Sequence, residues 1–259
     1  MTRNAPLTIP MIKKTKKNSN LFIYLFAVLM FLTVLPVQGS LTLQGPSGFV
    51  QVPSEKTIKA KEIEMAVHTR IYAVPLSSKD GYLTSLAFGF SPFRDFEIGV
   101  QKNIDSRNSA LDPDPTVNFK VRLPSIGQGE FSEAAFGMLV DTNPNNYHTM
   151  YFTLGGFGVG WNFGGNPGYG TASYGSYNRD KKEPDSICLL IGTEYPKRHP
   201  GDRGYKAHYY ADYNGDVYSI GWKYQSHRGF WVDAAVHSKS SYTDFYDYRP
   251  LILGVGAVF

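Results

Sequence analysis

Apolar and polar side chains alternate along much of the chain beyond residue 60. The clearest example runs from Glu62 to Ala73, where every second residue, from Ile63 to Ile71, is apolar or β-branched. The same alternation recurs in residues 95–101, 117–123, 218–225 and 230–237. A period of two is typical of a β-strand with one apolar face and one polar face. We therefore predict an all-β fold for this part of the chain.

Turn-forming residues separate the alternating windows. They include Asp112–Pro115, Asn143–Asn145 and Asn214–Gly215, the last being a strong hairpin dipeptide. The twelve expected strands begin near Glu62, Tyr82, Asp95, Thr116, Glu130, Tyr147, Gly168, Ser186, Tyr205, Asp216, Gly229 and Arg249. This arrangement predicts a closed antiparallel up-and-down β-barrel of about 12 strands, with eight or ten strands as alternatives.

The lengths of the connections mostly alternate between long and short, as they do in outer-membrane barrels. Residues 103–115, 178–185 and 238–248 are expected to form loops at one end, and residues 91–92, 125–129 and 226–228 short turns at the other. Residues 196–204 break the pattern, because they form a long connection where a short one is due.

The first 39 residues have the features of a secretory signal peptide. Lys13 to Lys17 form a basic region, residues 21–35 are almost entirely apolar, and Val37 to Gly39 precede a cleavage position before Ser40. The apolar stretch is shorter than the ~20 residues of a spanning helix, and Pro36 ends it. We predict a cleaved signal peptide at 1–39, an N-terminal periplasmic segment at 40–60 and the barrel at 61–259.

Composition excludes several classes of protein. The 259 residues include a single cysteine, Cys188, so an intrachain disulfide and a cysteine-based zinc site are excluded. The net charge of +4 arises in the leader, because residues 40–259 contain 21 basic and 22 acidic residues. We expect no nucleic-acid partner. The histidines at 68, 148, 208 and 227 do not cluster in sequence, so we expect no metal and no cofactor.

Alternation alone does not say whether the apolar face meets lipid or a packed core. Three features favour lipid: ionisable residues on the polar faces, aromatic residues near strand ends, and an apolar final strand at residues 251–259. We therefore expect a monomeric transmembrane barrel in the cell outer membrane. A soluble secreted barrel that binds an apolar ligand inside is the alternative, and it would fold without detergent.

The final strand, ending in Phe259, resembles the C-terminal signature of Gram-negative outer-membrane β-barrels. This resemblance implies that Phe259 is an assembly signal read by the barrel-assembly machinery, and that membrane lipid and lipopolysaccharide surround the protein. A second similarity covers Gly48 to Ser54 and Lys61 to Val67, which resemble the opening of YjbH-like barrels. That group is associated with exopolysaccharide export. Its members are often lipidated, whereas this chain lacks the lipid-accepting cysteine.

The polar faces supply the candidate site, a network of charges inside the barrel. Its expected members are Glu62, Glu64, Arg70, Asp95, Glu97, Lys120, Arg122, Glu133, Lys223 and Asp233. Buried charges persist only when they are paired, and side chains largely fill a barrel of this size. We therefore predict a charged, mostly filled lumen with no catalytic residues, in a protein with a structural or narrow-pore role.

Other patterns suggest chemistry that we regard as less well supported. Glu62 and Glu64 share a strand face, as an acid–base pair would. The adjacent His237 and Ser238 suggest a lipid-modifying barrel enzyme, but consecutive strand residues point to opposite faces. The glycine-rich stretch 155–160 lacks the following helix of a phosphate loop. The basic clusters Lys181–Lys182 and Lys197–His199 with Arg203 would bind lipopolysaccharide phosphates if they lie on outer loops.

Overall fold

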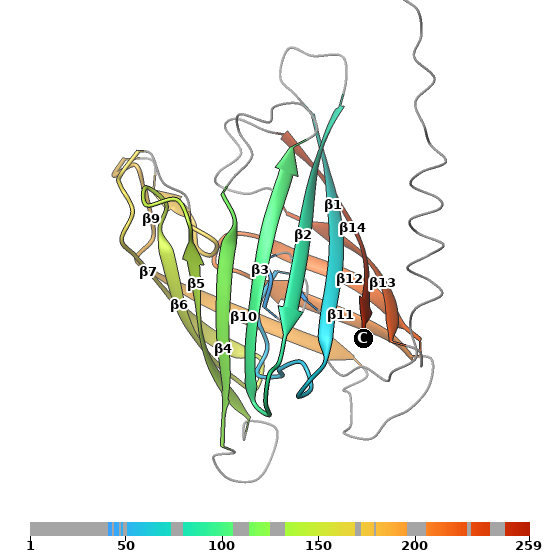
Figure 1. Cartoon of the computed structure of the whole chain (residues 1–259). Coiled ribbons are helices and arrows are strands. Elements are labelled where there is room, and N and C mark those ends of the chain that lie inside the picture. Colours follow the sequence, from blue (N-terminus) through green and yellow to red (C-terminus); the bar gives the residue numbers. More distant parts are fainter. Residues whose placement is uncertain are drawn as a thin grey trace, which may run out of the picture. The chain divides into compact units, whose positions relative to one another are not determined.

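The structure of the chain is a computed structural model (Figure 1). It describes residues 41–42, 44–46, 48, 51–73, 80–105, 114–124, 133–168, 172–178, 180–195, 206–226, 229–238 and 247–259. Within these ranges, no helix is long and apolar enough to cross a membrane.

Twelve long strands form the fold. They are β1 (Ile63–Ala73), β2 (Asp80–Phe90), β3 (Phe96–Asp105), β4 (Thr116–Leu123), β5 (Ala134–Asp141), β6 (His148–Leu154), β7 (Phe157–Phe163), β10 (Ile187–Tyr195), β11 (Lys206–Tyr213), β12 (Tyr218–Gln225), β13 (Phe230–His237) and β14 (Asp247–Val258). Each pairs antiparallel with its neighbours in the chain, and β14 pairs with β1 to close the ring. The prediction of a closed barrel of about twelve strands is confirmed. Two short strands, β8 (Tyr177–Asn178) and β9 (Glu183–Pro184), pair separately.

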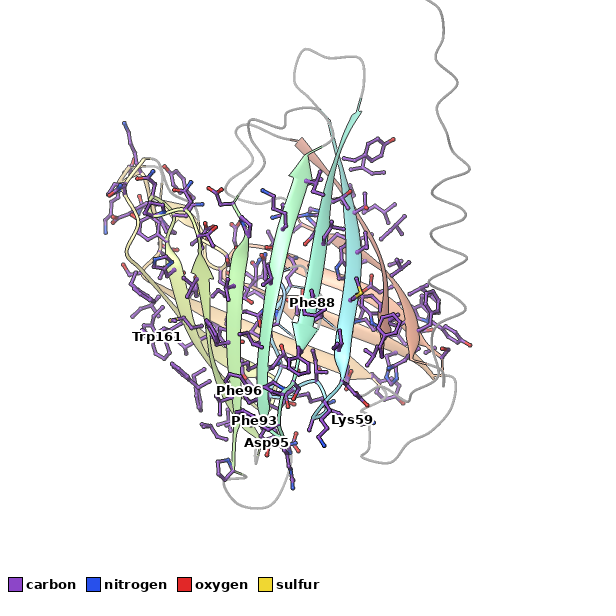
Figure 2. All side chains as sticks on the ribbon, in the orientation of Figure 1. Lys59, Phe88, Phe93, Asp95, Phe96 and Trp161 are labelled. Carbon is purple, nitrogen blue, oxygen red and sulfur yellow. The ribbon has the colours of Figure 1, made fainter. Side chains whose placement is uncertain are left out.

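The apolar face of the strands points outward and the polar face points inward. On β1, Met65 is 43% exposed whereas Glu64 and His68 are 0% exposed. Exposed and buried residues alternate in the same way on β10 and β12. Figure 2 draws the side chains on the strands, and Trp161 of β7 projects outward from the wall. The inward positions carry the ionisable residues of the sequence pattern. Periodicity alone left this orientation open, and the burial of Glu64 and His68 decides it.

The two ends of the barrel differ. β1 begins and β14 ends at the same end, where the backbones of Ile63 and Phe259 exchange two hydrogen bonds of 3.0 and 2.8 Å. We call this the Phe259 end and the opposite one the loop end. The strands expected to flank long loops at 103–115, 178–185 and 238–248 meet at the loop end. β10 and β11 are paired neighbours, and residues 196–205 connect them at the Phe259 end. The long connection noted in the sequence therefore does join two consecutive barrel strands, at the end where a short turn was expected.

One expected strand was wrong. Gly168 does not begin a barrel strand but lies in the connection between β7 and β10. The strand that takes its place is β7, which follows β6 through the two-residue turn Gly155–Gly156. Both glycines have positive φ, 55° and 89°, as the tight hairpin turns that match strand twist require. These two glycines belong to the glycine-rich stretch 155–160, which was not among the turns predicted from the sequence.

Two inward-facing glycines of β14 allow side chains of β1 and β13 to meet across it. Gly254 pairs with His68 on one side and Asp233 on the other, and a Cβ at this position would overlap both side chains. Gly256 likewise lies under the ring of Trp231. Because the ring passes over this glycine, the Trp231 Nε1–H donates a 2.8 Å hydrogen bond to Glu64 Oε1 on β1. Glycines opposite aromatic residues are a known device in curved sheets.

We predict that Gly256→Ala destabilises the barrel by about 1–3 kcal/mol, because the added methyl group displaces the Trp231 ring from Glu64. Denaturant unfolding in detergent, followed by far-UV circular dichroism, measures this loss. Val255→Ala is the control, since Val255 is on the outward face of the same strand. Equal losses for the two variants would contradict the proposed role of the glycine.

Candidate functional site

The N-terminal part of the described chain lies inside the barrel. Leu41, Val52 and Ile58 are 0%, 1% and 2% exposed, although none belongs to a barrel strand. We call residues 41–58 the lumen segment. Gly48 and Pro53 form an antiparallel bridge, so the segment turns back on itself within the ring of strands (Figure 1, blue). The described residues of the predicted periplasmic segment 40–60 are thus largely enclosed by the wall.

The turn of the lumen segment is held near the loop end. Its anchor is Gln51, whose backbone N–H donates a 2.8 Å hydrogen bond to Asp212 Oδ2 at the end of β11. The Gln51 side-chain amide donates to the Ser219 hydroxyl, and its oxygen accepts a 3.0 Å bond from Asn214 Nδ2. Because both the nitrogen and the oxygen of the Gln51 side-chain amide have a hydrogen-bond partner, the burial of this side chain at 2% exposure leaves neither atom unsatisfied.

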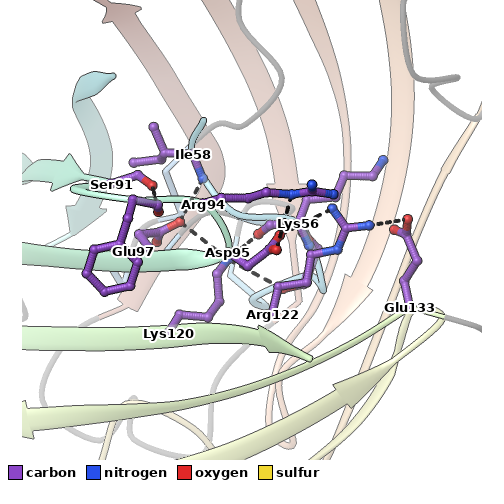
Figure 3. Close-up of polar contacts among 11 residues, drawn as sticks. Lys56, Ile58, Ser91, Arg94, Asp95, Glu97, Lys120, Arg122 and Glu133 are labelled. Atoms are coloured by element: carbon purple, nitrogen blue, oxygen red, sulfur yellow. Dashed lines mark hydrogen bonds and ion pairs between the residues drawn. The ribbon is translucent and has the colours of Figure 1, made fainter. Parts of the chain in front are cut away.

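The two legs of the segment are held near the Phe259 end by carboxylates of the wall. The Leu41 backbone N–H donates a 3.0 Å bond to Glu64 Oε1 of β1. The Ile58 backbone N–H donates a 3.1 Å bond to Glu97 Oε2 of β3, as Figure 3 shows. Hydrogen bonds to an ionised acceptor are about twice as strong as neutral ones. Carboxylates therefore receive backbone N–H groups of the segment near both ends of the lumen.

Two lysines, one on the wall and one on the returning leg, also join this leg to the wall. Lys120 of β4 donates to the carbonyl oxygens of Ser54 and Lys56, and its Nζ lies 3.6 Å from Glu97 Oε2. Both side chains of the Glu97–Lys120 pair are fully buried. Lys56 in turn reaches the wall, with its Nζ 2.6 Å from Glu194 Oε1 of β10. The predicted lumen charges thus hold a peptide segment as well as one another.

Apolar side chains fill the space between these polar contacts. One cluster surrounds the turn and contains Val52, Leu139, Tyr151, Tyr174, Cys188, Leu190, Tyr210, Ala235 and Ile252. A second cluster surrounds the start and finish of the segment and contains Leu41, Ile58, Ala66, Ala87 and Trp231. Each cluster includes residues of both segment and wall, so burial of apolar surface adds to the hydrogen bonds in holding the segment.

A separate group of charges lies on the wall around the closing strand. The His68 Nε2 and the Lys223 Nζ are 3.4 and 3.7 Å from the same oxygen, Oδ2 of Asp233. Lys223 also lies 4.8 Å from the centre of the Trp231 ring, at a distance typical of a cation–π contact. These groups link β1, β12 and β13, and therefore brace the closure of the barrel.

Further charges of the predicted network lie at the Phe259 end and are partly exposed. Arg122 bridges Asp95 at 3.8 Å and Glu133 at 2.7 Å. Glu62 lies just before β1, 3.9 Å from Lys59. Partial burial raises the pKa of the Glu62 carboxyl, and the charge of Lys59 opposes this rise.

The structure divides the ten predicted charges into groups. Glu64, Glu97, Lys120, Lys223 and Asp233 are buried in the lumen, Arg70 is half-buried on β1, and the other four are at the Phe259 end. The prediction missed Asp212, although His208, Tyr210 and Asp212 alternate with period two on β11. It also missed Gln51 and Ser219, because no pattern in residues 40–60 indicated that this segment enters the lumen.

His237 and Ser238 are neighbours on the chain but do not form a nucleophile–base pair. The Ser238 hydroxyl accepts a 3.0 Å hydrogen bond from the Tyr218 N–H, and His237 Nδ1 contacts the Ser238 carbonyl oxygen instead of the hydroxyl. No group of three or more His, Cys, Asp or Glu side chains suited to a metal occurs in the described ranges. Lys197, Arg198, His199 and Arg203 lie outside the described residues, whereas Lys181 and Lys182 are exposed between β8 and β9.

Comparison with protein-family models and a search of curated proteins gave no match.

We predict that Glu97→Ala and Lys120→Ala each destabilise the protein by about 3–5 kcal/mol, because each removes the opposite charge from a buried ion pair. The double variant should lose less than the sum of the two, with a coupling of about 1–3 kcal/mol. Denaturant unfolding of all four chains in detergent measures the coupling. Arg122→Ala is the control for an exposed pair, with an expected loss of about 0–1 kcal/mol. Strictly additive losses would show that the Glu97–Lys120 contact is not energetically significant.

Proposed function

We propose that this chain is a monomeric integral β-barrel of a Gram-negative outer membrane, without catalytic activity, whose lumen is closed by its own N-terminal segment. The observation that carries the proposal is the orientation of the wall. Large apolar side chains on many strands are exposed outside, including Leu86, Val100, Phe136, Leu189, Ile220 and Leu253. A continuous apolar surface of this kind is unfavourable in water and is the normal exterior of a barrel in lipid.

The distribution of aromatic residues supports the same environment. Tyr195 and Tyr209 are adjacent on β10 and β11 at the Phe259 end, 75% and 62% exposed. Tyr218 and Tyr82 are exposed on strands near the loop end. Tyrosine combines an apolar ring with a polar tip, so it is favoured at both interfaces of a bilayer. The two aromatic zones enclose the apolar band and would mark the membrane boundaries.

The resemblance of the final strand to outer-membrane barrels supports the location and two partners. Phe259 closes the barrel at the end where β1 begins, and in the proposed protein this end faces the periplasm, with Phe259 recognised by the barrel-assembly machinery. Export requires removal of residues 1–39. Outer-membrane lipid then surrounds the apolar band, and lipopolysaccharide contacts the loop end.

We predict that Leu253→Arg impairs folding into lipid vesicles by about 2–4 kcal/mol, because Leu253 lies in the middle part of β14 on the outward face. Tyr209→Arg, at the edge of the apolar band, should cost about 0–1 kcal/mol. Denaturant titration of folding into vesicles, read by heat-modifiable electrophoretic migration, measures both. A leaderless chain that folds as a monomer without lipid or detergent would overturn the proposed membrane location and favour the soluble alternative.

The narrower role we propose is passage or support beside exopolysaccharide export, as in YjbH-like barrels. One observation favours this extension: the resembling residues from Gly48 to Ser54 include the turn of the lumen segment. The part of the sequence that resembles this group thus lies where it blocks the lumen. In this proposal the complete chain is closed, and passage requires the segment to move.

A comparison of the complete chain with a variant that lacks residues 41–58 tests this role. We expect no steady conductance in planar bilayers from the complete chain and stepwise conductance from the variant, because removal of the segment takes away the backbone that runs through the lumen. Heat-modifiable migration establishes that both are folded. In a strain without the gene, exopolysaccharide secretion should fall, and the complete chain should restore it. Unchanged secretion would exclude the export link, and zero conductance from the folded variant would exclude a pore.

A further inference from the structure

We propose that Glu64 holds a proton while the lumen segment is in place and releases it when the segment leaves, so that the closed barrel opens more readily as the pH rises. This inference rests on the proposed role of residues 41–58 in closing the lumen, and it adds a means of regulating that closure. The groups that carry it are Glu64 of β1, Leu41 and Ile58 of the segment, and Trp231 of β13.

The hydrogen bonds of Glu64 place the proton on one oxygen. Oε1 accepts bonds from the Leu41 N–H at 3.0 Å and from the Trp231 Nε1–H at 2.8 Å. Oε2 is buried and has no hydrogen-bond partner among the described residues. An ionised carboxylate has two equivalent acceptor oxygens, whereas a neutral carboxylic acid has one carbonyl oxygen and one hydroxyl. The asymmetry therefore matches a neutral Glu64 with its proton on Oε2.

The surroundings do not neutralise an ionised Glu64. The side chain is 0% exposed and forms no ion pair within the part of the chain that the structure describes. The two lysines buried among the described residues serve other acids: Lys120 Nζ lies 3.6 Å from Glu97, and Lys223 Nζ lies 3.7 Å from Asp233. A buried ionised oxygen without a donor or a cation is far more unfavourable than a buried neutral hydroxyl.

The elements packed around Glu64 offer it no charge of its own. β2 and β14 place Gly89 and Val258 opposite it, and Leu41 and Ile58 of the lumen segment lie against Gly89. The charged and titratable groups of these and the neighbouring elements are Glu55 and Lys56 of the segment, Lys59, Glu62, His68, Glu97, Lys120, Lys223 and Asp233. Each of these groups interacts with a charged or titratable group other than Glu64. For Glu64, the proton itself is the compensating charge.

The lumen segment keeps this proton in place by excluding water. Leu41 and Ile58 belong, with Trp231, to the apolar cluster at the start and finish of the segment. When they leave, water reaches the carboxyl group, and a glutamic acid in water is ionised above pH ~4.3. The O–H bond of Glu64 then breaks, its electron pair stays on Oε2, and water takes the proton. The closed form thus binds one proton more than the open form, so a higher pH favours opening.

The anchor at Glu97 responds to pH in the opposite direction. Glu97 pairs with Lys120 and accepts the Ile58 N–H, so acid would protonate it and weaken a charge-assisted bond. The two bonds to Glu64 have instead the ordinary strength of neutral hydrogen bonds. A variant that alters only Glu64 therefore removes only the loss of closure at higher pH.

The first test is infrared spectroscopy of the folded chain. A protonated carboxylic acid has a C=O stretching band that an ionised carboxylate lacks. We expect this band near neutral pH in the unmodified chain, and its loss in Glu64→Gln, whose amide has nearly the shape of the neutral acid. Glu62→Gln is the matched control, because Glu62 lies two residues earlier and is partly exposed beside Lys59, and the band should persist there. Absence of a band that depends on Glu64 would overturn the proposal.

The second test measures how pH acts on the segment. The rate of tryptic cleavage after Lys56, in the returning leg, reports the population of the open form. Dividing this rate by that of Glu64→Gln at the same pH cancels the pH dependence of trypsin and of the other anchors. We expect the ratio to rise about tenfold from pH ~5.5 to ~6.5, because opening releases one proton. Glu62→Gln should show the same rise, and a ratio independent of pH would contradict the link between proton and segment.

Failure of the proposed function has a different signature. A barrel that folds in water without lipid would overturn the membrane location, and a folded variant that lacks residues 41–58 and does not conduct would exclude the pore. Both tests of the proton use a folded barrel in either medium, and neither depends on conductance. The two kinds of failure are therefore distinguishable.

Discussion

Ionisable side chains inside a closed barrel must find partners within the molecule, because the ring of strands separates them from bulk water. This constraint explains most of the interior. Glu97 and Lys120 face each other on β3 and β4, and Lys223 and Asp233 on β12 and β13. Direct cross-strand pairing satisfies the charges in part. The rest of their hydrogen-bonding capacity is used by the backbone of the lumen segment, which brings its own N–H and carbonyl groups into the barrel.

Closure of the ring depends on the same constraint. β14 carries Gly254 and Gly256 on its inner face, where any side chain would separate His68 from Asp233 or Trp231 from Glu64. Side chains of β1 and β13 therefore contact each other across the inner face of β14. Trp231 connects this seam to the lumen segment, since the carboxylate oxygen that accepts its N–H also accepts that of Leu41.

The strands and their inward charges could be predicted because period-two alternation survives wherever one face is apolar. It does so in β1, β3, β4, β12 and β13. The turn at Gly155–Gly156 was missed because glycine is compatible with both strand and turn. The lumen segment was missed for a different reason. Most of its described residues are enclosed by the wall without forming a barrel strand, so it shows no period-two pattern, and its partners such as Asp212 are distant in sequence. Only the closed ring brings them together.

The covalent link between the lumen segment and β1 gives its contacts more effect than the same contacts would have in a separate peptide. A tethered segment binds without the loss of translational freedom that a free ligand incurs. Its anchors are also distributed along the lumen, with Gln51 at one end and Leu41 and Ile58 at the other. Loss of one anchor leaves the others in place, so the segment leaves the barrel only when both ends are released. In the proposed function a closed lumen is therefore the stable state, and any event that opens it must act on the two ends together.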